Sequence, residues 1–260
     1  MGYVDSNGIK VHYNVKGTGE PIVFLHSLGA KSELWDQQVE YFQDNYKVIT
    51  IDARGHGKTD SCIPFKVEDC AYDVKAILDY LDIDKAHIVG ISMGGHMALE
   101  LYQMVPERIK SITLSNTFAK IPDHIREEKM NARLKLLEQD NFVQEWARIS
   151  VHEGADYQLI DHTIGLYGCS KEDYKSAWIE INHVDFSDML NTVDLPVLVM
   201  TGDKDYIAPV KLAQFLQENI KKSRLDLISN AGHLANLSNP KEFNEKVASF
   251  LAEVNLSLQT

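Results

Sequence analysis

The feature that most constrains this chain is the segment Gly90-Ile91-Ser92-Met93-Gly94-Gly95. It lies between a predicted strand at residues 86–89 and a predicted helix at residues 96–104. So abrupt a turn from strand to helix requires a strained backbone at the residue between them, which here is Ser92. The glycines at positions 90 and 94 relieve the crowding across that turn. Gly-x-Ser-x-Gly in this setting is typical of a nucleophile elbow, which raises the serine hydroxyl above the edge of a sheet. The alternative is a tight turn with an incidental serine, but the strand, the helix and the second glycine favour the elbow.

Short apolar runs rich in Val and Ile predict the strands of a parallel sheet. They occupy residues 22–25, 48–51, 87–91, 109–115, 197–201 and 224–228. Helices are predicted between and after them at residues 33–43, 67–81 and 240–253. The dipeptide Asn7-Gly8 predicts a two-residue hairpin turn, so an antiparallel hairpin leads into the sheet. The predicted fold class is α/β, with a mostly parallel central sheet, helices on both faces and a helical lid insertion.

The region 118–192 interrupts this alternation, because it is rich in predicted helix and has no clear strand. Its helices are predicted at residues 123–138, 142–151 and 171–181. An insertion of this kind is typical of a lid, since functional segments gather at the carboxyl edge of a parallel sheet. The expected organisation is a core built from residues 1–117 and 193–260, with residues 118–192 as the lid.

Composition limits the classes of partner. The 260 residues carry a net charge of −12 with scattered acidic side chains, which argues against nucleic acid. The three cysteines, at positions 62, 70 and 169, form no CxxC pair, so free thiols in a reducing compartment are expected. The first residues do not resemble a signal peptide, and no apolar run approaches the roughly 20 residues that span a bilayer. A cytoplasmic protein with no membrane partner is expected, and the oligomeric state stays open.

Three other patterns do not indicate a cofactor. Gly57-Lys58-Thr59 resembles the end of a phosphate-binding loop, but Asp52 stands where its first glycine is needed. Gly17-x-Gly19 lacks the third glycine and the helix of a dinucleotide motif. His26, Asp52 and His56 do not have the spacing of a metal site, so they are expected to brace loops. No cofactor and no metal are expected, and the partner is predicted to be a small-molecule substrate.

A base for Ser92 is predicted at His233, which follows the last predicted strand and can reach back over the sheet edge. A carboxylate should hold the imidazole in its useful tautomer. Asp203 and Asp205, which follow the strand at residues 197–201, are both candidates. The alternative for this acidic segment is a polar turn, because Gly-Asp-Lys-Asp is also favourable turn chemistry.

Two backbone N–H groups should bind an oxyanion formed at the serine. The Met93 N–H lies at the predicted helix N-terminus, and the second donor is expected after residues 22–25, with Leu28 the first candidate. Ser27 is the second candidate donor and a possible substrate contact, and His26 is expected to brace this loop. Four aromatic residues of the lid are expected either to line the substrate pocket or to pack the lid helices. They are Trp146, Tyr157, Tyr167 and Trp178.

Four segments together resemble the α/β-hydrolase family along nearly the whole chain. They are His26-Ser27-Leu28-Gly29, residues 52–57, residues 90–95 and Ala231-Gly232-His233. The family pattern Gly-x-x-Asp falls on Gly202 and Asp205. The resemblance therefore implies that Asp205, rather than Asp203, completes a triad with Ser92 and His233.

Within that family, the sequence is similar to 3-oxoadipate enol-lactonase-like hydrolases and to carboxylesterases, through Ser27-Leu28-Gly29, residues 231–236 and residues 181–186. The resemblance implies hydrolysis of a carboxylic ester or an enol-lactone through an acyl-enzyme. Two alternatives use the same residues: hydrolysis of a carbon–carbon bond in a vinylogous diketone, and a ligand sensor that keeps its triad. The sequence departs from the lactonases at His26, and its lid arginines are expected to be solvated and to form no cluster. These are Arg126, Arg133 and Arg148.

Overall fold

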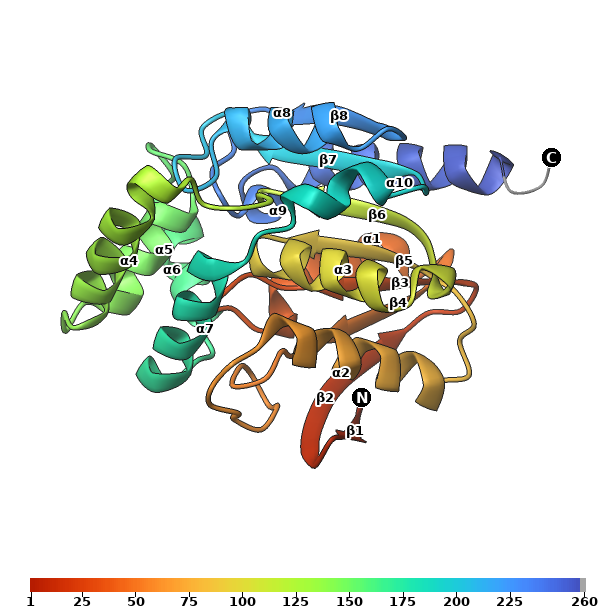
Figure 1. The fold of residues 1–260 in the computed structure, drawn as a ribbon, viewed down its shortest axis with the longest axis horizontal. Coiled ribbons are helices and arrows are strands. Elements are labelled where there is room, and N and C mark those ends of the chain that lie inside the picture. Colours follow the sequence, from red (N-terminus) through yellow and green to blue (C-terminus); the bar gives the residue numbers. More distant parts are fainter. Residues whose placement is uncertain (258–260) are drawn as a thin grey trace.

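The computed structural model describes residues 1–257, in which eight strands form one sheet (Figure 1). The strands are β1 (Gly2–Ser6), β2 (Ile9–Lys16), β3 (Glu20–Leu25), β4 (Tyr46–Ile51), β5 (Ala86–Ile91), β6 (Ile109–Ser115), β7 (Val197–Gly202) and β8 (Ser223–Ile228). Their order across the sheet is β1-β2-β4-β3-β5-β6-β7-β8. β2 pairs antiparallel with both β1 and β4, and every pair from β4 to β8 is parallel. The predicted α/β class is confirmed.

The central strands are covered on both faces, which explains why they read as continuous apolar runs. Every residue of β5 and of β7 is buried. β8 differs because it is an edge strand, and Ile228 is its one buried residue. The N-terminal hairpin is also as predicted, since Asn7 and Gly8 have φ values of 53° and 80°, as a type I′ turn requires.

Helices cover both faces of the sheet. α1 (Asp36–Phe42) and α10 (Pro240–Ser257) contact each other on one face, and α2 (Val67–Tyr80) and α3 (Met93–Met104) contact each other on the opposite face (Figure 1). α8 (Val210–Asn219) packs beside β7 and β8. The helix predicted at residues 33–43 is divided, because it begins as a short 3-10 helix before α1. The short helices are η1 (Ser32–Trp35), η2 (Pro106–Arg108), η3 (Ser187–Thr192) and α9 (Ala235–Ser238).

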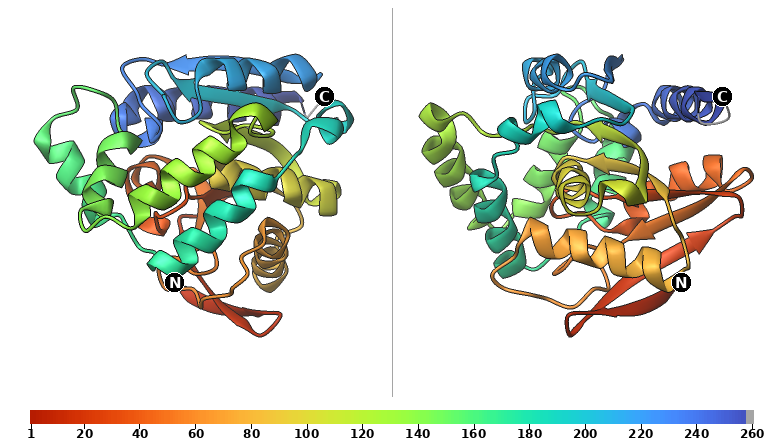
Figure 2. Two further views of the ribbon diagram at one scale, coloured as in Figure 1. Left: turned by 60° about the vertical axis from the view of Figure 1, so that its left-hand side comes forward. Right: turned by 45° about the vertical axis from the view of Figure 1, so that its right-hand side comes forward.

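Four helices lie between β6 and β7 and gather at one end of the sheet, as the green segments of Figures 1 and 2 show. They are α4 (Asp123–Leu137), α5 (Phe142–Ser150), α6 (Tyr157–Gly165) and α7 (Lys171–His183). α6 is not among the helices predicted from the sequence. Its start is marked by Asp156, whose carboxylate accepts a hydrogen bond from the Leu159 N–H at 2.8 Å. This cap is a local signal for a helix of only nine residues, which is short for detection by periodicity.

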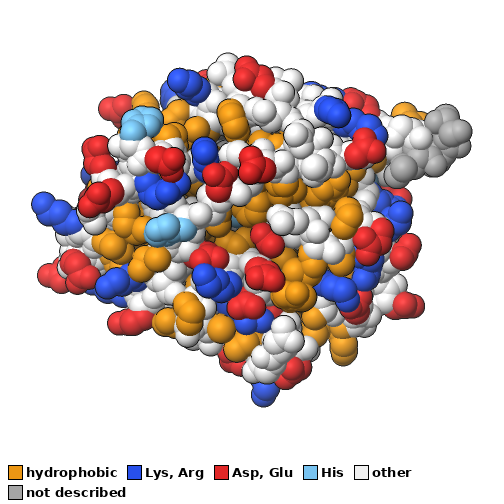
Figure 3. Space-filling view, viewed as in Figure 1, with side chains coloured by type: hydrophobic (Ala, Val, Ile, Leu, Met, Phe, Trp, Pro, Cys, Tyr) orange, Lys and Arg blue, Asp and Glu red, His pale blue; other side chains and the backbone are white. Residues whose placement is uncertain are grey.

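Acidic and basic side chains are intermixed on the face seen in Figure 3, without a large block of one sign. This face therefore offers no basic stripe of the kind that nucleic acid requires. Across residues 1–257, no helix is long and apolar enough to cross a membrane.

A buried ion pair joins the loop after β4 to helix α2. Arg54 Nε donates to Asp73 Oδ2 at 2.8 Å, and Arg54 Nη2 donates to Asp73 Oδ1 at 2.9 Å. Both side chains are no more than 3% exposed. The same guanidinium donates to the Ser6 carbonyl of β1 at 3.4 Å. The pair therefore holds together the loop after β4, helix α2 and the first strand.

Asp73→Ala should destabilise the protein strongly, because it removes the bidentate partner of the buried Arg54 and leaves only the partly exposed Asp69 carboxylate, 3.4 Å from Nη1. The expected loss in the free energy of unfolding is about 3–5 kcal/mol. Asp79→Ala is the matched control on the same helix, since Asp79 pairs with Lys75 and Arg108 at 46% exposure and should contribute at most about 1 kcal/mol. Urea unfolding of both variants measures the difference, and equal losses would contradict the assigned importance of the buried pair.

Candidate active site

Ser92 occupies the strained turn between β5 and α3. Its backbone has φ 53° and ψ −115°, a region that residues other than glycine rarely adopt. The two neighbouring glycines are required by space. A Cβ at Gly90 would overlap the Gly94 carbonyl oxygen, and a Cβ at Gly94 would overlap the Leu25 carbonyl oxygen. The turn therefore presses the start of α3 against the end of β3 and leaves Ser92 partly exposed.

Three of the predicted side chains meet at this turn. Ser92 Oγ lies 2.8 Å from His233 Nε2, and His233 Nδ1 lies 2.9 Å from Asp205 Oδ2. Asp205 follows β7 and His233 follows β8, so neighbouring parallel strands deliver the two groups to the same sheet edge. Asp203, the other sequence candidate, instead accepts a hydrogen bond from the Ala231 N–H at 3.2 Å. The geometry thus separates the two aspartates and places Asp205 behind the imidazole.

The buried Asp205 carboxylate is held by several donors besides His233. Its Oδ1 accepts from the N–H groups of Ile207 at 2.8 Å and Ala208 at 2.9 Å, and its Oδ2 accepts from the Asn116 amide at 2.9 Å. Burial raises the pKa of Asp205, but His233 and these hydrogen bonds outweigh it, so the pKa lies below its ordinary value. A carboxylate that stays ionised holds Nδ1 of the imidazole protonated and leaves Nε2 able to accept a proton.

Backbone N–H groups near the turn are open to a ligand. Met93 is the first residue of α3, where a helix N-terminus leaves its N–H without an intrahelical acceptor. Within residues 1–257, neither the Met93 N–H nor the Leu28 N–H donates a hydrogen bond. Ser27, the second candidate from the sequence, is buried, and its carbonyl accepts from the Ala30 N–H at 3.1 Å. The Ser27 N–H donates no hydrogen bond in these residues either, so it stays the second candidate beside the open N–H groups of Leu28 and Met93.

Two neutral histidines hold the loop after β3. His26 Nε2 accepts from the Ala53 N–H at 2.9 Å, and its Nδ1 donates to the Ser27 carbonyl at 2.8 Å. His56 Nε2 accepts from the Gly29 N–H at 3.1 Å, and its Nδ1 donates to a backbone carbonyl two residues earlier at 2.8 Å. Because each Nε2 accepts an N–H, both rings are uncharged. Burial lowers both pKa values, that of His56 to about 3, and the predicted bracing by His26 is confirmed.

Two of the predicted pocket aromatics pack against this loop. Trp146 is buried, and its indole N–H donates to the Leu28 carbonyl at 3.2 Å. An added Cβ at Gly29 would lie 3.0–3.1 Å from atoms of Trp146, Tyr167 and Tyr174. The rings of Trp146 and Tyr167 also contact each other, with centroids 5.3 Å apart, so both residues pack within the lid and against the core loop.

Trp178 lies instead in the wall of a cavity of about 240 Å³. Phe118, Tyr206 and Ile207 line the same cavity, so it adjoins the loop that carries the Asp205 carboxylate. Tyr157 is 86% exposed, and its predicted place in a pocket or in the lid packing is wrong.

Two cations of α4, Lys129 and Arg133, also line this cavity. Lys129 Nζ donates to the Ile207 carbonyl at 3.2 Å, and Arg133 Nη1 donates to the Tyr174 hydroxyl at 2.9 Å. In the part of the chain that the structure describes, neither cation forms an ion pair with a carboxylate. Burial and the nearby Arg133 lower the pKa of Lys129.

Arg133 is half-buried, so the expectation that it is solvated holds only in part: its guanidinium lies 5.2 Å from the centre of the Trp178 ring. Lys129 is not among the residues predicted from the sequence, where the lid arginines alone are named as cations. Its spacing of four residues from Arg133, which places both on one helix face, was the available signal.

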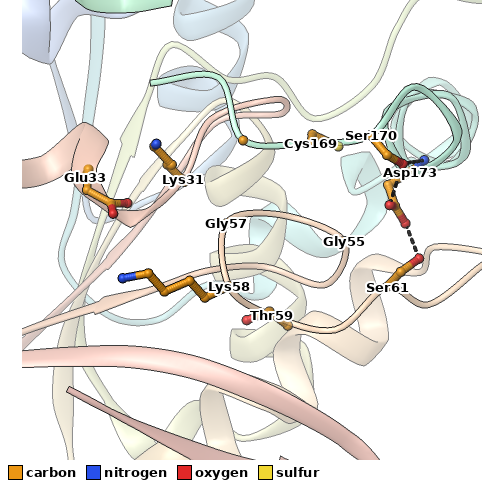
Figure 4. Close-up of a pocket in the computed structure, with 11 residues that line it drawn as sticks. Lys31, Glu33, Gly55, Gly57, Lys58, Thr59, Ser61, Cys169, Ser170 and Asp173 are labelled. Atoms are coloured by element: carbon orange, nitrogen blue, oxygen red, sulfur yellow. Dashed lines mark hydrogen bonds between the residues drawn. The ribbon is translucent and has the colours of Figure 1, made fainter. Parts of the chain in front are cut away.

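A larger cavity, of about 510 Å³, is lined by the loop of residues 55–61 and the start of α7, and does not include Ser92 (Figure 4). Figure 4 shows Lys31 and Lys58 on one side of it and Asp173 on the other, where Ser61 and Ser170 donate to the carboxylate. Cations and carboxylates thus face the same space, and this cavity has no evident preference for one class of ligand. Among residues 1–257, no group of three or more His, Cys, Asp or Glu is arranged to hold a metal ion.

Comparison with known proteins places this geometry in a family. Residues 20–158 match the family described as the alpha/beta hydrolase fold. The chain belongs to the α/β-hydrolase fold family. This α/β-hydrolase is 32% identical to 3-oxoadipate enol-lactonase 2 of Acinetobacter baylyi, over 90% of this chain and 89% of the relative. It is 31% identical to 3-oxoadipate enol-lactonase 1 of the same organism, over 95% of this chain and 94% of the relative.

A solved enol-lactonase from Burkholderia xenovorans is similar to this α/β-hydrolase along its length. The TM-score is 0.87 at 26% sequence identity, and the match covers 96% of this chain and 99% of the other. The resemblance inferred from the four sequence segments is therefore confirmed at the level of the family.

The neutral state of His56 predicts a pH dependence of stability. Its pKa in the folded protein, about 3, lies far below the ordinary value of 6.5. As the pH falls below about 6.5, the unfolded chain takes up a proton that folded His56 does not. The contribution of His56 to the free energy of unfolding should therefore be largest above that pH and decline toward pH 3. The decline should be at most about 1.4 kcal/mol per pH unit.

His56→Gln is the variant that isolates this contribution, because an amide oxygen can still accept the Gly29 N–H but does not titrate. Urea unfolding at several pH values between about 6.5 and 4.5 should show a shallower decline for the variant than for the wild type. Equal slopes would contradict the buried neutral state of His56.

Proposed function

We propose that this α/β-hydrolase cleaves a carboxylic ester or a lactone through Ser92, His233 and Asp205. The observation that carries the proposal is the 2.8 Å approach of His233 Nε2 to the Ser92 hydroxyl on a nucleophile elbow, with Asp205 behind the imidazole. The two enol-lactonase relatives and the solved enol-lactonase support this class of bond. In this proposal, residues 118–192 form a helical lid on a core made of residues 1–117 and 193–260.

In the first step, His233 Nε2 takes the hydroxyl proton as Ser92 Oγ attacks the substrate carbonyl. The electron pair of the C=O bond moves to oxygen, and the N–H groups of Leu28 and Met93 bind the resulting oxyanion. Asp205 stabilises the imidazolium through the hydrogen bond at Nδ1. The C–O bond to the leaving group then breaks, and the leaving oxygen takes the proton from His233 to give an acyl-enzyme.

In the second step, His233 removes a proton from water as the water oxygen attacks the acyl carbonyl. The same two N–H groups bind the second oxyanion, and its collapse returns the proton to Ser92 Oγ with release of the carboxylic acid. When the substrate is a lactone, the leaving oxygen stays attached to the acyl group. Ring opening then gives an acyl-enzyme that already carries a free hydroxyl or enol.

Lys129 and Arg133 favour a substrate that carries a negative charge. Both line the cavity beside the acid loop, and the Ile207 N–H in that loop donates to Asp205. Much of the remaining wall is apolar, so a charge-assisted hydrogen bond in the cavity is weakly screened. In a chain of net charge −12, two cations without a carboxylate partner favour an anionic ligand. We infer a substrate that carries a carboxylate, and the ester pair below tests its placement on the acyl side.

Ser92→Ala should remove nearly all hydrolysis of a p-nitrophenyl ester series, leaving roughly the 10³–10⁴-fold acceleration over water that binding and the oxyanion donors supply. Because triad members act as a unit, Ser92→Ala combined with His233→Ala should lose little more than either change alone. Ser249→Ala, at an exposed serine of α10, is the matched control and should keep wild-type turnover. Turnover by Ser92→Ala close to that of the wild type would exclude Ser92 as the nucleophile.

The wild type should hydrolyse mono-p-nitrophenyl adipate with a higher kcat/KM than p-nitrophenyl hexanoate, which has the same chain length without the carboxylate. Lys129→Met should reduce this ratio by about tenfold, the order of one charge-assisted hydrogen bond. Lys135→Met makes the same change at an exposed position of the same helix and should leave the ratio unchanged. After subtraction of the uncatalysed rate, a wild-type ratio near one, or a ratio that survives Lys129→Met, would contradict the anionic substrate.

A further inference from the structure

Helix α5 contacts two loops of the proposed site at once. At its middle, the Trp146 indole N–H donates to the carbonyl of Leu28, the residue whose N–H is a proposed oxyanion donor. At its end, the Ser150 carbonyl accepts from the Leu234 N–H at 2.7 Å, one residue after His233. Trp146 and Ser150 are four residues apart and so lie on the same helix face. This nine-residue helix therefore links the loop after β3 to the loop after β8.

The backbone that follows α5 lies directly on the histidine loop, because a Cβ at Gly232 would overlap the Val151 carbonyl. The face of α5 that makes these contacts is buried. Its buried residues are Phe142, Trp146, Ala147 and Ser150. In α4, by contrast, Leu137 is the one buried residue of fifteen. Within the insertion, α5 is thus fixed to the core, whereas α4 packs much more loosely.

The direction of the Leu28 N–H is set by hydrogen bonds on the two adjacent peptide groups. The Ser27 carbonyl accepts from His26 Nδ1 at 2.8 Å, and in a planar trans peptide the N–H points opposite to the carbonyl. Fixing that oxygen therefore aims the Leu28 N–H. The next peptide group, which joins Leu28 to Gly29, is held on both sides. Its carbonyl accepts from the Trp146 indole N–H at 3.2 Å, and its N–H donates to His56 Nε2 at 3.1 Å. Both peptides must stay in place for Leu28 to keep one backbone conformation.

We propose that Trp146 is a positioning residue for the oxyanion donor, because its indole N–H fixes the Leu28 carbonyl and thereby the backbone that aims the Leu28 N–H. This inference rests on the proposed serine hydrolase function, in which that N–H binds the oxyanion. Trp146 touches neither the substrate nor the reacting atoms in this role. It acts through the loop, and α5 holds the same loop in register with His233 through the contact of Ser150 with Leu234.

Trp146→Phe tests the proposal, because it keeps an aromatic ring and removes the indole N–H. The kcat for p-nitrophenyl butyrate should fall by between about 3-fold and the roughly 10²-fold that loss of a whole oxyanion donor costs, with KM little changed. The affinity for phenylboronic acid should fall in parallel, since its tetrahedral adduct with Ser92 places an oxygen at the oxyanion position. A merely structural role would lower the melting temperature without moving kcat and boronate affinity together.

Trp35→Phe is the matched control. Trp35 is fully buried against Phe24 and Phe243, and its indole N–H has no acceptor within residues 1–257, so the change affects packing alone. This variant should lose stability but keep the wild-type kcat and boronate affinity. Kinetics of Trp146→Phe that match those of Trp35→Phe, once both are folded, would overturn the proposal.

Hydrogen exchange gives a readout that does not depend on catalysis. Amides in the peptide of residues 24–32 should exchange faster in Trp146→Phe than in the wild type and in Trp35→Phe, because the loop has lost one of its fixed carbonyls. Unchanged exchange would overturn the positioning role. Full ester turnover by Ser92→Ala would instead overturn the proposed function, and the exchange measurement would still decide whether Trp146 holds the loop.

Discussion

The strained backbone at Ser92 is the constraint on which the rest of the site depends. A residue with φ 53° and ψ −115° stays in that conformation only when the surrounding structure holds it. β5 is buried along its whole length, and α3 lies so close to the end of β3 that only glycine fits at position 94. The same close approach brings the loop that continues from β3 to the N-terminus of α3. The turn that presents Ser92 therefore also brings the open N–H groups of Leu28 and Met93 close to each other.

Residues 1–257 contain two buried Asp–His pairs, and the difference between them shows what a candidate site requires. His12 Nδ1 lies 2.8 Å from Asp52, and His233 Nδ1 lies 2.9 Å from Asp205. Burial raises the pKa of both aspartates, yet their charged and hydrogen-bonding neighbours bring both below the ordinary value. The second ring nitrogen separates the pairs: His233 Nε2 meets Ser92, whereas His12 Nε2 is buried without a hydrogen-bond partner in residues 1–257. A carboxylate behind an imidazole is therefore insufficient, and the hydroxyl in front of it marks the candidate site.

Features that depend on neighbouring residues could be predicted from the sequence, and features that depend on tertiary contacts could not. The strands and the elbow follow from local apolar runs and glycines, and His233 follows from its place after a strand. The preference for Asp205 over Asp203 came from the family resemblance. In the structure Asp205 contacts the His233 ring whereas Asp203 accepts from the Ala231 N–H, and these are tertiary contacts that no local pattern contains. Trp146 and Trp178 look alike as lid aromatics, yet one bonds a backbone carbonyl of the core and the other lines a cavity. An amphipathic pattern shows which helix face is buried, but not what it packs against.

The helices between β6 and β7 therefore have two tasks: to support the loops of Leu28 and His233, and to let the substrate enter. These tasks conflict if the four helices move as one body. Displacement of α5 would break the contacts of Trp146 with Leu28 and of Ser150 with Leu234, so both loops would lose their support whenever the site opened. Preorganised donors stabilise an oxyanion because they need no reorganisation during the reaction, and that advantage requires α5 to stay in place. α4 has a single buried residue, and it is held by one hydrogen bond of Lys129 to the acid loop and by contacts of Met130 and Arg133 with α7, so its displacement would break contacts with α7 but few with the sheet. Substrate access is thus compatible with a fixed site when motion is confined to α4, the helix that also carries the two cations proposed to select the substrate.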